Sequence, residues 1–129
     1  MNTIVLAGGK GERLKPLTLK IPKPMVEVRG KPILWYILTQ LDKCGMKKVN
    51  VMVGYKSEVI KEYFSKNFTK MDINIFDGGD IDIIARIRAI TNSNPKEDVL
   101  VLYGDTISNV DITKLLEFHK EAPKMGTLT

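Results

Sequence analysis

The sequence is poor in the residues that build disulfide-linked or metal-linked scaffolds. Its 129 residues include one cysteine, Cys44, and one histidine, His119. A single cysteine cannot form an internal disulfide, and the two residues together supply too few ligands for a structural zinc site. Both fall late in helical patterns. We therefore interpret Cys44 as a packing residue rather than a reactive thiol, and His119 as a surface residue rather than a catalytic one.

Long apolar runs are also lacking. No stretch approaches the roughly 18 to 20 apolar residues that a membrane span requires. The opening MNTIVLAGG has neither the basic start nor the long apolar stretch of a secretory signal. We therefore expect a cytoplasmic protein that has no membrane partner. With 43% hydrophobic and 27% charged residues, the composition is that of one ordinary globular domain over residues 1–129.

Excess positive charge is absent from most of the chain and concentrated in one segment. The net charge of +5 comes from residues 10–31, which hold seven cations against Glu12 and Glu27, whereas the remainder carries 13 charges of each sign. That segment has no aromatic residue, and the first in the chain is Trp35. A nucleic-acid surface is typically a basic stripe with aromatics for stacking. The distribution instead predicts a small, strongly anionic ligand and no nucleic-acid partner.

Apolar strands and helices alternate along the chain. The patterns predict strands at 3–6, 49–53, 73–76 and 99–103, and helices at 32–44, 57–64, 83–90 and 112–120. Ser57 and Asp111 are expected to cap two of these helices, and the terminal MGTLT is expected to begin another strand. This alternation indicates a parallel sheet covered on both faces, in which ligands bind at the carboxyl ends of the strands.

A glycine-rich, cationic loop follows the first predicted strand. Gly8, Gly9 and Gly11 allow backbone N–H groups to converge on phosphate oxygens. Arg13 and Lys23 add positive charge for the same anion. Three prolines later in the loop stiffen it and hold it away from helix. A stiff cationic loop of this kind is typical of a lid over a binding site.

Two other phosphate-binding motifs are excluded by spacing. A Walker loop needs lysine followed by serine or threonine, whereas Lys10 and Lys31 are followed by Gly11 and Pro32. A dinucleotide fingerprint needs a third glycine at the position of Leu14. The loop therefore needs another explanation.

The segment LAGGKGERLKPLTLKIPKPMVEVRGKPIL closely resembles the opening signature of sugar-1-phosphate nucleotidyltransferases, in which GGxGxRLxPLT and PKPM wrap a nucleoside triphosphate. Downstream, GKPILWYI, GYKSEVIKEYF and YGDTISNVDITKLLEFHK are most similar to the glucose-1-phosphate cytidylyltransferase branch. DGGDIDIIARIR is a looser match to that branch's DTG and GGRIKR segments. The resemblance implies a Rossmann-like, three-layer α/β nucleotidyltransferase fold with a mainly parallel sheet. It also implies a Mg²⁺-dependent enzyme that converts CTP and a hexose 1-phosphate, glucose 1-phosphate being expected, to CDP-hexose and pyrophosphate.

The resemblance also implies roles for individual residues. The implied nucleotide-binding set is Leu6, Ala7, Gly8, Gly9, Gly11, Glu12, Arg13, Lys23 and Gly104. The backbone of residues 6–9 would line the base and ribose. Of the two catalytic residues, Arg13 would hold the β and γ phosphates, and Lys23 would lie between the attacking sugar phosphate and the α phosphorus. Asp105 would bind Mg²⁺, although the residues alone leave open that Gly104 and Asp105 form only a turn.

The chain departs from the family pattern at two places. Glu12 stands where the family commonly has a hydroxyl residue, so its carboxylate should point away from a triphosphate or hold a cation. Residues 81–86 replace the small-residue LGTAGA pattern with which many relatives read the base. The expectation of CTP rather than dTTP or UTP therefore rests on the flanking similarity.

The resemblance covers roughly the first half of a typical family member. It implies that the chain is an apparently truncated, nucleotide-binding N-terminal portion with an exposed sheet edge. A homo-oligomer or a partner chain is then expected to complete it. The alternatives are a split transferase, a non-catalytic nucleotide-binding module, a remnant that is stable only as an oligomer, and a dTTP- or UTP-using transferase.

Overall fold

The computed structural model describes residues 1–67, 71–79, 82–92, 95–122 and 124–129. Within these residues, the main sheet consists of β1 (Asn2–Leu6), β4 (Lys48–Val53), β5 (Asp72–Asp77) and β6 (Val99–Tyr103). The strands are all parallel and lie in the order β5-β4-β1-β6. The register places Val5 of β1 beside Val51 of β4 and Leu102 of β6. The expected parallel sheet is confirmed.

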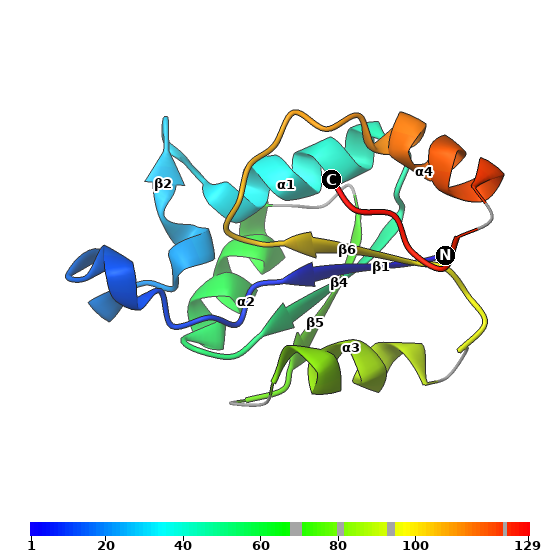
Figure 1. Ribbon diagram of the computed structural model, residues 1–129. Coiled ribbons are helices and arrows are strands. Elements are labelled where there is room, and N and C mark those ends of the chain that lie inside the picture. The colour runs from blue at the N-terminus through cyan, green and yellow to red at the C-terminus, as the bar shows by residue number, and fades with distance from the viewer. Residues whose placement is uncertain (68–70, 80–81, 93–94, 123) are drawn as a thin grey trace.

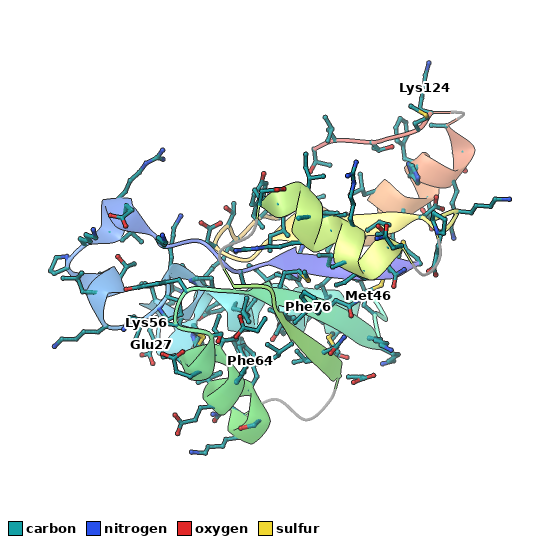
Figure 2. All side chains as sticks on the ribbon, turned by 90° about the horizontal axis from the view of Figure 1, so that it is seen from below. Glu27, Met46, Lys56, Phe64, Phe76 and Lys124 are labelled. Carbon is teal, nitrogen blue, oxygen red and sulfur yellow. The ribbon has the colours of Figure 1, made fainter. Side chains whose placement is uncertain are left out.

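The helices lie on both faces of this sheet (Figure 1). They are α1 (Ile33–Lys43), α2 (Ser57–Asn67), α3 (Ile83–Thr91) and α4 (Ile112–Glu121). Residues of α1, α2 and α4 share one apolar cluster, whereas α3 packs on the opposite face, nearest the viewer in Figure 2. The three-layer arrangement expected from the sequence is therefore confirmed. None of the described helices is both long and apolar enough to cross a membrane.

The pleat of the strands divides the core between the two faces. Val5 and Val51 are fully buried in the larger cluster, together with Leu38 of α1. Ile4 and Met52, one residue along each strand, are equally buried against α3. Because neighbouring residues on a strand point to opposite faces, a strand buried between two helix layers must be apolar throughout. This requirement explains the uninterrupted apolar runs.

A second, short sheet follows the cationic loop and was not predicted. Here β2 (Glu27–Val28) pairs antiparallel with β3 (Lys31–Pro32), directly before α1. Arg29 and Gly30 form the turn, and both have positive φ values, 51° and 77°. Two-residue turns with positive φ are common in hairpins, but arginine gives little sequence signal for one.

Two expected details of the secondary structure are wrong. Ser57 is the first residue of α2 rather than the capping residue before it, and its hydroxyl donates to the carboxylate of Asp77 at the end of β5. The terminal MGTLT, residues 125–129, forms no strand. By contrast, Asp111 caps α4 as expected, since its side chain accepts a hydrogen bond of 3.1 Å from the Lys114 N–H.

The sheet is less completely covered at β6 than the sequence pattern predicts. This strand is at an edge of the described sheet, and Val101 and Tyr103 are 40% and 61% exposed. Both side chains lie on the α3 face, since Leu100 and Leu102 belong to the larger cluster on the other face. The expected exposed edge is therefore present in the described chain.

Candidate functional site

The cationic loop leaves the carboxyl end of β1 and folds back on itself. Residues 8–25 are all described and form three turns of 3₁₀ helix, at Glu12–Leu14, Leu17–Leu19 and Lys23–Met25. The expectation that prolines keep this loop free of helix is therefore correct for α-helix only. Proline fixes φ near the value that a short 3₁₀ turn uses, so it starts such turns readily.

Two hydroxyl groups anchor the loop. Gly11 has a positive φ of 62°, and its carbonyl accepts a hydrogen bond of 2.9 Å from the buried Thr18 hydroxyl. The Thr18 carbonyl in turn accepts a hydrogen bond of 3.0 Å from Tyr55. A Cβ at Gly11 would approach Thr18 Cγ2 to 2.8 Å and Lys23 Cβ to 3.0 Å. The loop is therefore a fixed wall that holds Lys23 in place. Sequence patterns gave no signal for Thr18 or Tyr55.

A cavity of about 740 Å³ lies between this loop, the carboxyl ends of β1 and β6, and the start of α3. It is lined by residues 6–14, Lys23, Pro24, Asp82, Ile83, Arg86, Tyr103 and Asp105. The structure thus brings together the expected site residues except Gly104. Gly104 directly follows β6, and a Cβ there would come within 2.9 Å of the Leu6 carbonyl oxygen.

The sheet already uses part of the backbone expected to line a base and ribose. The Leu6 carbonyl accepts a hydrogen bond of 2.8 Å from the Gly104 N–H, and the Ala7 N–H donates one of 2.8 Å to Met52. These groups extend the parallel pairing one residue past the strands. The Leu6 carbonyl and the Ala7 N–H are therefore already paired within the sheet.

Lys23 and Asp105 form an ion pair across the cavity. Lys23 Nζ lies 2.6 Å from Asp105 Oδ2, and the two side chains are 34% and 31% exposed. The resemblance implied separate roles for these residues, one on phosphate and one on metal. In the structure, the charge of each side chain neutralises that of the other. A ligand that uses either group must compete with this pair.

Arg13 and Glu12 occupy the first turn of the loop. Arg13 is exposed, lines the cavity and forms no ion pair within the described part of the chain. Glu12 pairs with Lys15 on the same turn, and this hydrogen bond holds the pKa of the Glu12 carboxyl below its usual value. Of the two alternatives given for Glu12, to point away from a triphosphate or to hold a cation, the structure shows an ion pair with Lys15. Arg13 remains available to an anion.

A carboxylate at the end of β5 organises the neighbouring edge of the sheet. Asp77 accepts hydrogen bonds from the Ser57 hydroxyl, from Lys61 Nζ at 2.9 Å and from the Gly79 N–H at 3.2 Å. These bonds lower the pKa of Asp77 to about 2, with the bond from Ser57 as the largest cause. Asp77 thereby fixes the turn at Gly79 to the start of α2.

This network predicts an acid-dependent loss of stability. The folded pKa of Asp77 is about 2, below the ordinary value of about 3.9, so the stabilisation is complete above pH 4 and disappears as the pH falls toward 2. We expect Asp77→Asn to lower the free energy of unfolding by about 1 kcal/mol at pH 7, because the side chain is exposed and its charge is screened. Urea unfolding at pH 7 and pH 2.5 checks this, and an equal difference at both values would contradict it.

Arg86 is the site residue that sequence reasoning missed. Its side chain comes from α3, is 7% exposed, and places its guanidinium against Gly8. The sequence interpretation placed this residue only within a segment that departs from the family's base-reading pattern. Residue 81 of that segment lies outside the described part of the chain. An arginine in a short helical pattern predicts an exposed side chain, so no local signal indicated its burial.

A parallel α/β sheet with a glycine-rich cationic loop at the carboxyl ends of its strands defines a nucleotide-binding domain. The family model described as nucleotidyl transferase matches residues 2–129, and the chain belongs to that family. The resemblance to sugar-1-phosphate nucleotidyltransferases is therefore confirmed.

Individual relatives differ in the nucleotide that their names specify. The chain is 35% identical to the glucose-1-phosphate cytidylyltransferase of Salmonella typhimurium, over 100% of this chain and 60% of that protein. It is 34% identical to the D-glycero-alpha-D-manno-heptose 1-phosphate guanylyltransferase of Aneurinibacillus thermoaerophilus, over 92% and 52% of the two chains. It is 36% identical to the UTP–glucose-1-phosphate uridylyltransferase of Haloferax volcanii, over 94% and 50%. The chain thus spans about half to three fifths of the length of these relatives.

Solved structures agree on the fold. HddC from Yersinia pseudotuberculosis, solved in complex with GMP-PN, superimposes with a TM-score of 0.78 at 27% identity, over 91% of this chain and 53% of that one. A putative glucose-1-phosphate thymidylyltransferase from Bacillus anthracis superimposes with a TM-score of 0.79 at 22% identity, over 94% and 50%. The latter similarity supports the fold alone.

Proposed function

We propose that the protein transfers a nucleotidyl group from a nucleoside triphosphate to a sugar 1-phosphate, with CTP as the donor and a hexose 1-phosphate, glucose 1-phosphate being expected, as the acceptor. The observation that carries this proposal is the anchored loop. It places Arg13 and Lys23 in the lining of the same cavity as Asp105, which follows β6. Two cations in a cavity lined by glycine-rich backbone suit two phosphate-bearing substrates. The choice of CTP is supported by the similarity to the cytidylyltransferase.

The proposed reaction is a single in-line displacement. An oxygen of the sugar phosphate attacks the α phosphorus, the bond from that phosphorus to the bridging oxygen of the β phosphate breaks, and pyrophosphate leaves. The attacking phosphate is already ionised near pH 7, so no general base is required. The chain's task is to position two polyanions and to offset their repulsion. Lys23 would do so between the acceptor phosphate and the α phosphorus, and Arg13 at the β and γ phosphates.

Asp105 fits a magnesium ion that is held mainly by the substrate. Within the described residues, no three histidine, cysteine or carboxylate side chains cluster as a self-sufficient metal site. Mg²⁺ is commonly bound by one or two carboxylates together with substrate phosphates, and Asp105 can supply one such oxygen ligand on the cavity wall. The ion would supply charge neutralisation at the phosphates. Release of Lys23 from Asp105 would then direct the lysine to phosphate.

The main alternative is a nucleotide-binding module without turnover. The chain spans 60% of the cytidylyltransferase length, and a transferase must also hold the sugar phosphate against the α phosphorus. The proposal includes a homo-oligomer or a partner chain that contributes to the acceptor side. A cytoplasmic location remains part of the same proposal.

Nucleotide titration followed by a pyrophosphate assay tests the proposal. We expect the purified protein to bind CTP in the presence of Mg²⁺ and to release pyrophosphate when glucose 1-phosphate is added. Binding without release would favour the module. No triphosphate binding at all would contradict both interpretations, and release with UTP or dTTP but not CTP would keep the transferase and change its donor.

A further inference from the structure

Tyr55 holds the cationic loop from outside, through its hydroxyl group. The phenolic O–H donates a hydrogen bond of 3.0 Å to the Thr18 carbonyl, in the middle 3₁₀ turn of the loop. Tyr55 does not line the cavity, so it cannot touch a phosphate bound there. The bond nevertheless connects the turn after β4 to the loop that carries the cations of the site.

The backbone of the loop makes its hydrogen bonds with itself. Within residues 11–25, the N–H groups that pair with backbone in the described chain donate to carbonyls three or four positions earlier. Such bonds shape each 3₁₀ turn, but they cannot fix the turns relative to the sheet. The placement of the loop therefore depends on side chains. Besides Tyr55, these include the buried Thr18 and Met25 and the ion pair of Lys23 with Asp105.

Thr18 connects the Tyr55 bond to both cations of the loop. It is 1% exposed, and its own hydroxyl donates a hydrogen bond of 2.9 Å to the Gly11 carbonyl. Gly11 directly precedes the 3₁₀ turn that carries Arg13. A Cβ at Gly11 would lie 3.0 Å from Lys23 Cβ, so this glycine also packs against the start of the lysine side chain. One path of contacts therefore leads from Tyr55 to Arg13 and Lys23.

The turn that carries Tyr55 is bonded to the sheet on its far side. Gly54 packs closely there, since a Cβ would come within 2.8 Å of the Gly79 carbonyl oxygen. The Ser57 N–H donates a hydrogen bond of 3.2 Å to the Gly54 carbonyl, and the Ser57 hydroxyl donates to Asp77 at the end of β5. The Tyr55 hydroxyl is therefore attached to a turn that β4 and β5 hold in place.

We propose that Tyr55 is a positioning residue, whose bond to Thr18 fixes the loop so that Arg13 and Lys23 are in place before phosphate binds. A loop that is ordered in advance costs less to order on binding, which raises affinity. It also holds the cations at the geometry that transfer requires, and a displacement of about 1 Å can lower a rate by about 10²-fold. This inference rests on the proposed function and adds to it a residue outside the cavity.

Tyr55→Phe tests this proposal, because it removes the donor and keeps the ring, which lies 5.5 Å from Lys56 Nζ. Calorimetry measures the dissociation constants of CTP and inorganic tripolyphosphate, and pyrophosphate release gives kcat and KM. We expect both affinities to fall about fivefold, the factor that corresponds to the net contribution of one hydrogen bond. We expect kcat to fall at least about tenfold, because the cations are no longer held at the required geometry.

Tyr36→Phe is the matched control. Tyr36 also donates its hydroxyl to a backbone carbonyl, that of Val28 at 2.7 Å, but this bond joins α1 to β2, and neither residue lines the cavity. The control thus removes a bond of the same kind away from the site. It should lower the melting temperature as the loss of a hydrogen bond does, and leave both affinities and kcat at their wild-type values.

Two substitutions at Thr18 separate positioning from a general loss of stability. Thr18→Val keeps the branched shape and removes the hydroxyl that bonds Gly11, whereas Thr18→Ser keeps that hydroxyl. We expect the valine variant to repeat the effects of Tyr55→Phe and the serine variant to retain wild-type affinity and kcat. Because the two bonds act in series on one loop, combining Tyr55→Phe with Thr18→Val should cost little more than either change alone. Thermal unfolding by circular dichroism checks that each variant is folded.

The outcomes distinguish this proposal from the proposed function. Wild-type affinity and kcat in Tyr55→Phe, or losses no larger than those in Tyr36→Phe, would overturn the positioning role and leave the transferase intact. Additive losses in the double variant would indicate two independent bonds and would overturn it as well. If the wild-type protein binds tripolyphosphate but releases no pyrophosphate, the module replaces the transferase, and the tripolyphosphate affinities still decide the role of Tyr55. Absence of binding to both CTP and tripolyphosphate would overturn both proposals.

Discussion

Lys23→Ala is expected to reduce the rate of pyrophosphate release by about 10²- to 10³-fold, the loss typical when one charge-stabilising group is removed from a transition state. The variant removes the cation that would offset repulsion between the sugar phosphate and the α phosphate. It also leaves Asp105 without its partner at 2.6 Å, which adds negative charge to the cavity. Both changes act on phosphate, so CTP binding without Mg²⁺ should weaken as well.

The fold should tolerate this change. Lys23 begins a 3₁₀ turn between two prolines, and its Cβ, which packs near Gly11, is kept in alanine. Lys20→Ala is the matched control, because Lys20 is an exposed lysine of the same loop that does not line the cavity. Steady-state rates for both variants, with thermal unfolding as the check on folding, decide the question. Retained turnover in Lys23→Ala would contradict the assigned role.

Much of the fold was predictable because the spacing of apolar residues along the chain follows which side chains are buried. The strand at Val99–Tyr103 was predicted with the bounds that the structure has, and Asp111 was identified as a cap. Parallel order followed from apolar strands that alternate with helices. The terminal MGTLT shows the limit of this reasoning, since a few apolar residues satisfy a strand pattern but nothing in the described structure pairs with them.

The site was predictable where chemistry is local and unpredictable where it depends on contacts across the chain. Gly11, Arg13 and Lys23 lie within one short loop, and their residue types alone indicate an anion site. The pairing of Lys23 with Asp105 joins residues 82 positions apart, and the bond from Tyr55 to the Thr18 carbonyl joins residues 37 apart. No periodic pattern records such contacts.

Asp105→Asn is expected to have opposite effects on two measurements. Removal of the carboxylate charge releases Lys23 from its ion pair, so CTP should bind about fivefold more tightly without Mg²⁺, as expected if a partly exposed pair is worth up to about 1 kcal/mol. The same variant loses the proposed oxygen ligand for the metal. Pyrophosphate release should therefore fall by about 10²-fold, the scale of losing one charge-stabilising group, and added Mg²⁺ should no longer strengthen CTP binding.

Asp111→Asn provides the charge-matched control for this experiment. Asp111 caps α4 outside the cavity, and asparagine caps helices about as well as aspartate, so both measurements should match the wild-type protein. Calorimetric titration with CTP, with and without Mg²⁺, measures the affinities of both variants. If Asp105→Asn instead weakens Mg²⁺-free binding, then the carboxylate orients Lys23 toward phosphate and does not compete for it. The ion pair between the loop and β6 would then be a pre-formed part of the anion site, present before any metal arrives.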